Sequence, residues 1–257
     1  MTDALIVTGP VNATQLGVPK DAEYHVLHIH PKGSDIGSTA MGIAAATWLG
    51  GLSIRDRVEK MVGPVDRIGV AWFSAGHGSV RSILKTSKPE SVAAWICIDG
   101  LYGSNEFAVE LAESAMRGDT SLLATASVST PGQYDHSLDR WRDVAARVEA
   151  PLADGSVATG LGLPPPAECW SEGRCLIAGY PDIGHGAQVP AMRDAALRWW
   201  DSPPALPPGL NPATPPVTPF PVPVSQSPGI DGWLWFGGIA VAAGLGYLLL
   251  KGQKVKL

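Results

Sequence analysis

The sequence predicts an α/β fold, with a mostly parallel sheet of about six strands, helices on both faces of the sheet, and a C-terminal transmembrane helix. Apolar runs of strand length alternate with segments of helical spacing through residues 1–201, and strands that are apolar throughout are typical of parallel sheets. A proline-rich segment and a long apolar run follow. These observations divide the chain into a globular domain (1–201), a linker (202–232), a transmembrane helix (233–250) and a basic tail (251–257).

Each predicted element is an apolar run or an amphipathic segment. The candidate strands are "ALIVTG" near residue 6 and the runs at 24–31, 67–73, 92–100, 122–129 and 175–180. Helical spacing predicts helices at 38–62, 77–87, 104–117, 137–149 and 188–200. Functional groups of such sheets collect where the strands end, so the residues just after each strand are the first candidates for a site.

The C-terminal region predicts a membrane anchor on a stalk. Residues 202–232 carry eleven of the 23 prolines and a single charge, and proline at this density favours an extended, semi-rigid spacer. The uncharged run 233–250 would span about 27 Å as a helix, close to the hydrocarbon thickness of a bilayer. Trp233 and Tyr247 suit the two membrane interfaces, and lysines follow the run.

Composition limits the partners and leaves the orientation of the anchor open. The formal charge of −5 provides no basic face for phosphates, so nucleic acid is not an expected partner. Lysines after the anchor favour a cytoplasmic tail and an external domain, yet no secretion signal is apparent at the N-terminus. Either the short tail crosses the bilayer, or the protein meets its membrane by another route, such as virion assembly.

Cysteine and histidine spacings do not predict a metal site. Cys169 and Cys175 in "CWSEGRC" fit either a small disulfide loop or two unpaired thiols in a loop, and Cys97 lies in an apolar run. His28 and His30 share one face of a predicted strand, but no carboxylate or cysteine cluster accompanies them. We therefore expect no metal and no cofactor.

The stretch "RIGVAWFSAGHG" places Ser74 between a predicted strand and a predicted helix. A nucleophilic serine at such a turn needs small neighbours, and the usual pattern is G-x-S-x-G. Ala75 and Gly76 fit the second half of that pattern, whereas Trp72 occupies the first glycine position. The motif is half matched, and Trp72 puts the backbone geometry at Ser74 in question.

His185 is the candidate general base. It lies between two glycines in "PDIGHGAQ", after the last predicted strand and before the last helix of the domain. A base must reach the nucleophile from such a loop, and flanking glycines permit that approach.

Together, the "FSAGHG" turn, the "GHG" before the closing helix and the strand–helix order resemble the α/β-hydrolase superfamily, in a short form without a large lid. The resemblance covers about residues 4–200. It implies a triad in the order serine, acid, histidine, so the acid should follow a strand between Ser74 and His185.

Two aspartates compete for the role of the acid. Asp99 ends the strand "WICIDG" and precedes a glycine, so it is favoured. Asp135 follows the next strand, which is the commoner position in the superfamily, but it lies about six residues beyond that strand. Asp182, or no aspartate at all, is the remaining alternative.

The resemblance also implies an oxyanion hole made of backbone N–H groups. Ala75, directly after the nucleophile, should supply one donor, and the loop around Lys32 and Gly33 should supply the other. His30 is expected to orient that loop, and His77 is expected to form a wall of the pocket.

The expected function is that of a membrane-anchored serine hydrolase that cleaves an ester or an amide through Ser74, His185 and Asp99. The alternative is a catalytically inactive domain of the same fold, displayed as a binding or structural module at a membrane or virion surface.

Overall fold

The structure is a computed structural model, and it describes residues 2–32, 35–128 and 136–202. The strands are β1 (Thr2–Thr8), β2 (His25–Ile29), β3 (Val65–Phe73), β4 (Ala94–Ile98), β5 (Ser121–Ala126), β6 (Glu168–Glu172) and β7 (Cys175–Gly179). The α-helices are α1 (Ser38–Leu49), α2 (Ile54–Val62), α3 (His77–Ile83), α4 (Glu106–Met116), α5 (Ser137–Arg147), α6 (Ser156–Gly160) and α7 (His185–Asp201). Two short 3-10 turns, Ser74–Gly76 and Pro89–Ser91, precede α3 and β4.

The strands form one sheet in the order β2-β1-β3-β4-β5-β7-β6. All neighbouring pairs are parallel except β6 and β7, which form an antiparallel hairpin. The chain moves from β1 outward to β2 and then returns to the other side of β1 with β3. The strand order therefore reverses between β1 and β3, the position where open α/β sheets bind their ligands.

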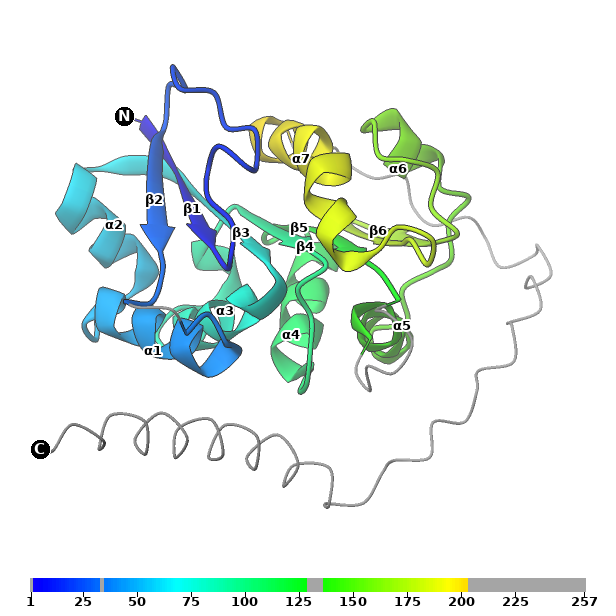
Figure 1. Cartoon of the computed structure of the whole chain (residues 1–257), viewed down its shortest axis with the longest axis horizontal. Coiled ribbons are helices and arrows are strands. Elements are labelled where there is room, and N and C mark those ends of the chain that lie inside the picture. The colour runs from blue at the N-terminus through cyan, green and yellow to red at the C-terminus, as the bar shows by residue number, and fades with distance from the viewer. Residues whose placement is uncertain (1, 33–34, 129–135, 203–257) are drawn as a thin grey trace, which may run out of the picture. The chain divides into compact units, whose positions relative to one another are not determined.

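Helices cover both faces of the sheet (Figure 1). One face packs against α1 to α5, and the other packs against α7 with α6 and the segment after β1. Alternate residues of each strand enter the two cores: Trp72 faces the five-helix side, whereas Phe73 faces α7. The predicted α/β class with a mostly parallel, helix-flanked sheet is confirmed.

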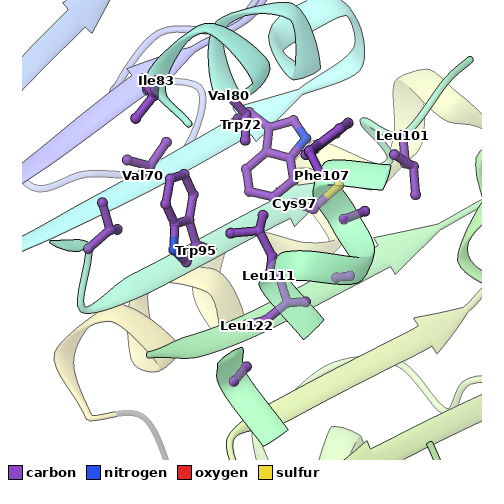
Figure 2. Packing of buried hydrophobic residues seen from close by; sticks show 14 of the residues in the cluster. Val70, Trp72, Val80, Ile83, Trp95, Cys97, Leu101, Phe107, Leu111 and Leu122 are labelled. Carbon is purple, nitrogen blue, oxygen red and sulfur yellow. The ribbon is translucent and has the colours of Figure 1, made fainter. Parts of the chain in front are cut away.

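The five-helix side holds the bulky part of the core next to the end of β3. Trp72 and Trp95 are 1% and 0% exposed, and their rings meet edge to face with centroids 6.4 Å apart. Figure 2 shows Trp72 beside Cys97 of β4 and Phe107 of α4. Buried aromatic pairs in this geometry stabilise a fold by about 0.5–1.5 kcal/mol beyond the area that they bury. The strand that leads to Ser74 is thus firmly held.

Several details of the elements differ from the sequence prediction, among them the short additional helix α6. The single helix predicted at 38–62 is two helices, because Gly50 adopts a left-handed conformation with φ of 60° and ends α1. Ser53 then caps α2 by accepting a hydrogen bond from the Asp56 N–H. The segment "CWSEGRC", predicted as a loop, is a hairpin in which β6 is an additional edge strand turned by Gly173.

The predicted linker, transmembrane helix (233–250) and basic tail lie outside the described residues, apart from Ser202 at the start of the linker. In the part of the chain that the structure describes, no helix combines the length and the apolar character needed to cross a bilayer.

The close contact between β3 and α7 predicts a destabilising substitution. In Gly69→Ala the added Cβ would lie 2.6 Å from the Trp200 indole, so α7 would have to shift. We expect the free energy of unfolding to fall by about 1–3 kcal/mol, measured by urea denaturation. Gly160→Ala is the matched control, because a Cβ there meets no neighbouring atom. Equal denaturation midpoints for the two variants would contradict the contact.

Candidate active site

The register of the parallel strands brings the strand ends together at one edge of the sheet. Thr8 pairs with Trp72, Phe73 pairs with Ile98, and Ile98 pairs with Thr125. The residues that follow, Gly9, Ser74, Asp99 and Ser127, must therefore lie along the same edge. Two of them, Ser74 and Asp99, are candidates from the sequence.

Ser74 lies on a sharp turn between β3 and α3. Its φ is 53°, in the left-handed region that non-glycine residues enter only at a cost of about 1–2 kcal/mol. The turn directs the chain from the strand through Ser74–Gly76 into α3, and Ser74 itself is half-buried. A strained serine with a strand before it and a helix after it is the backbone arrangement of a nucleophile elbow.

Glycines let the neighbouring segments approach this turn. A Cβ on Gly76 would lie 2.7 Å from the Thr8 carbonyl oxygen at the end of β1. A Cβ on Gly9 would collide with the Phe73 carbonyl oxygen, and one on Gly78 would collide with the backbone of Ser38 at the start of α1. The backbones of β1, α1 and the turn are thus in direct contact, so Ser74 has little freedom to move.

Trp72, at the position of the missing motif glycine, is accommodated by Gly100, which lies just after the next strand. A Cβ on Gly100 would lie 2.6 Å from Trp72 Cδ1 and 3.1 Å from the Ser74 nitrogen. The Trp72 indole N–H also donates a hydrogen bond of 2.9 Å to the Gly100 carbonyl. The small residue that the turn requires is therefore supplied by the segment after β4, and the turn at Ser74 forms despite Trp72.

Asp99 is a fixed, buried carboxylate. It is 0% exposed and follows β4 with a φ of 44°. Its Oδ1 accepts the backbone N–H of Ser127 at 2.8 Å, and its Oδ2 accepts the Ser127 hydroxyl at 2.6 Å. Charge-assisted hydrogen bonds of this kind are the stronger ones in proteins, so the carboxylate has one orientation.

His185, predicted to lie in the loop before a helix at 188–200, is instead the first residue of α7, and Asp99 holds its ring. His185 Nδ1 lies 2.7 Å from Asp99 Oδ2. The imidazole stacks on Phe73, with ring centroids 4.5 Å apart and planes 18° apart. One turn later in α7, the buried Gln188 side chain donates to the Ile183 carbonyl at 3.2 Å and ties down the loop that leads to His185. The remaining ring nitrogen, Nε2, is the one left for a substrate or a nucleophile.

The structure brings His185 to Asp99 and places both beside the Ser74 turn. Among the described residues no hydrogen bond joins Ser74 Oγ to His185, although His185 stacks on Phe73, the residue directly before Ser74. Catalytic hydrogen bonds are often long in the free enzyme and tighten when substrate binds.

The other acid candidates lie elsewhere. Asp135 falls outside the described residues. Asp182 is exposed in the loop before α7. Within the described part of the chain, Asp99 is the carboxylate that contacts His185.

Of the expected oxyanion donors, Ala75 lies in the turn with Ser74, whereas Lys32 lies away from it. Ala75 follows Ser74 in the turn. Lys32 is exposed beyond β2, which β1 separates from β3, and Gly33 falls outside the described residues. The loop after β1, beginning at Gly9, lies directly against Phe73. The linear sequence does not reveal that β1 lies between β2 and β3, so it did not identify this loop as a candidate source of an oxyanion donor.

The second histidine of the motif supports the turn. His77 is 6% exposed, and its Nδ1 lies 3.1 Å from the Ser74 carbonyl oxygen, within hydrogen-bonding distance. Its ring also faces that of Tyr102, with centroids 6.0 Å apart. Tyr102, three residues after Asp99, in turn lies against His185. It was missed, although a polar aromatic residue between glycines just after a strand end was a signal that could have found it.

The three cysteines are free and buried, so none of them is a candidate nucleophile. Burial raises the pKa of the Cys169 thiol to about 11 and that of Cys175 to about 12. Burial likewise raises the pKa of the Cys97 thiol. A thiol becomes an effective nucleophile as the thiolate, and these three groups stay protonated at neutral pH.

No protein-family model and no curated protein matches this chain. The architecture, a mostly parallel sheet flanked by helices, is compatible with that of the α/β-hydrolases.

The contact between Trp72 and Gly100 predicts a coupled pair of substitutions. Gly100→Ala should lower the free energy of unfolding by about 1–3 kcal/mol, because its methyl meets a rigid, buried indole. Trp72→Leu should also destabilise the fold, but in the double variant the smaller side chain makes room for the methyl. We expect the double variant to lose about 1 kcal/mol less unfolding free energy than the sum of the two single losses, measured by thermal denaturation. If the losses of the two single variants simply add in the double variant, the idea that Gly100 makes room for the Trp72 ring is contradicted.

Proposed function

We propose that this protein is a serine hydrolase of the α/β-hydrolase type that cleaves an ester or an amide. The observation that carries the proposal is the 2.7 Å contact between Asp99 and His185, placed beside a serine with left-handed backbone geometry. A nucleophile, a base and a buried acid at neighbouring strand ends are the parts that acyl transfer needs.

In this proposal Ser74 Oγ attacks the carbonyl carbon of the substrate. His185 Nε2 accepts the serine proton and later donates it to the leaving group. The Asp99 carboxylate accepts the Nδ1 hydrogen, which keeps Nε2 unprotonated before attack and stabilises the imidazolium that forms. Water then attacks the acyl-enzyme ester with the help of the same base and releases the acid product.

The tetrahedral intermediate requires donors for its oxyanion. The backbone N–H of Ala75 is the first donor in the proposal. Two loops compete for the second: the loop of Lys32 and Gly33, and the loop that begins at Gly9. The strand order favours the loop at Gly9, because β1 is the immediate neighbour of β3.

A second candidate function is a non-catalytic binding module with the same fold. The absence of a hydrogen bond between Ser74 and His185 among the described residues favours it, since an inactive domain needs no such contact. Reaction with an active-site reagent distinguishes the two candidates.

A fluorophosphonate probe tests the hydrolase directly. We expect one phosphonate adduct on the peptide that contains Ser74, detected by mass spectrometry, and no adduct in Ser74→Ala. His185→Ala should slow labelling by about 10³-fold or more, because the hydroxyl loses its base.

Ser82→Ala is the matched control, because the Ser82 hydroxyl donates to the Gly42 carbonyl on the far side of α3 and takes no part in the proposed chemistry. The control should be labelled at the wild-type rate. Folded protein that stays unlabelled would favour the binding module.

We further propose that residues 233–250 anchor the protein in a lipid bilayer. The full chain should co-sediment with phosphatidylcholine vesicles, because burial of this uncharged run is favourable in hydrocarbon. A chain that ends at residue 232 keeps the linker and should stay in the supernatant. Full-length protein that stays soluble beside the vesicles would contradict the anchor.

A further inference from the structure

Among the described residues, two oxygens lie within hydrogen-bonding distance of His185 Nδ1, and one belongs to Asp99. The second is the Tyr102 hydroxyl, whose Oη lies 3.0 Å from the same nitrogen. The Tyr102 ring meets the imidazole edge to face, with centroids 5.9 Å apart and planes 79° apart. One ring nitrogen therefore faces both a carboxylate and a phenol.

The presence of a hydrogen on Nδ1 determines which atom donates and which accepts in these two contacts. Asp99 accepts on both oxygens from Ser127, and a carboxylate can only accept, so the hydrogen between Asp99 and His185 belongs to Nδ1. With that hydrogen in place, Tyr102 Oη can contact Nδ1 only as a second acceptor. The Nδ1 hydrogen is shared between a strong acceptor and a weaker one.

The loop after β4 holds Tyr102 in this position. Leu101 is 0% exposed, and its backbone N–H approaches the Ser137 hydroxyl at 3.4 Å. The loop is therefore anchored in the core one residue before Tyr102. The Tyr102 ring also faces His77, whose Nδ1 lies beside the Ser74 carbonyl oxygen, so Tyr102 lies between the base and the turn of the nucleophile.

We infer that Tyr102 is a positioning residue for His185: its hydroxyl shares the Nδ1 hydrogen with Asp99 and helps to hold the imidazole in the tautomer that leaves Nε2 unprotonated. The role in turnover rests on the proposed hydrolase function. The contact to Nδ1 does not, and the two can be tested separately.

Kinetics of Tyr102→Phe test the role in turnover, because this change removes one oxygen and keeps the ring. With 4-nitrophenyl acetate as the probe, kcat should fall about threefold to tenfold, the effect of losing one hydrogen bond, while KM stays unchanged. A raised KM with an unchanged kcat would mean that Tyr102 contacts substrate, and would overturn the inference.

Tyr180→Phe is the matched control, since the Tyr180 hydroxyl donates to the Pro164 carbonyl at 3.0 Å. Its kcat should equal that of the wild type.

The Asp99→Ala background shows whether the two acceptors share one hydrogen. Without the carboxylate, Tyr102 becomes the remaining acceptor that the structure places at Nδ1, so Tyr102→Phe should reduce kcat by a larger factor there than in the wild type. An equal or smaller factor would show that the two residues act independently and would overturn the inference.

Nuclear magnetic resonance of the full chain in detergent micelles tests the contact without any turnover. With ¹⁵N-labelled histidine, the chemical shift of the His185 Nδ1 hydrogen should change in Tyr102→Phe and stay the same in Tyr180→Phe. An identical resonance in wild type and Tyr102→Phe would overturn the inference, even if Asp99→Ala fails to fold. A shifted resonance in a protein that no fluorophosphonate labels would support the contact and reject the hydrolase.

Discussion

The hydrogen bond between Asp99 and His185 fixes how the start of α7 meets the end of β4. Asp99 ends a central strand, and His185 begins the long helix that covers one face of the sheet. Their contact requires α7 to start at the carboxyl edge of the sheet, above Phe73. The packing of Trp199 and Trp200 fixes the other end of α7 against that same face. The core therefore sets where His185 lies.

Close backbone packing at the strand ends is the second constraint. Ser74 and Asp99 both hold left-handed backbone conformations, which cost about 1–3 kcal/mol each in ordinary sequences. The surrounding contacts enforce them: glycines at 9, 76 and 100 let β1, the turn and β4 approach until a methyl group no longer fits between them. Strain at two adjacent strand ends, supported by a dense aromatic core, is the pattern of a preorganised site.

The sequence predicted those features that depend on local patterns. Continuous apolar runs identified the parallel strands, and the residues at the strand ends included Ser74, Asp99 and His185. The contributions of Gly100 and Ser127 could not be predicted, because each depends on which strands are neighbours and in what register, whereas Tyr102 had a local signal in its position just after a strand end. The strand order likewise places the loop at Gly9, rather than that at Lys32, beside β3. The break after α1 was local, and the pair Gly50–Gly51 was a signal for it.

The most direct measurement is a crystal structure of the protein after reaction with diethyl 4-nitrophenyl phosphate. We expect a covalent bond from Ser74 Oγ to phosphorus, a phosphoryl oxygen within about 3 Å of the Ala75 N–H, and His185 Nε2 facing an ester oxygen with Nδ1 still on Asp99. An unmodified Ser74, or an imidazole that leaves Asp99 when the adduct forms, would contradict the proposed triad.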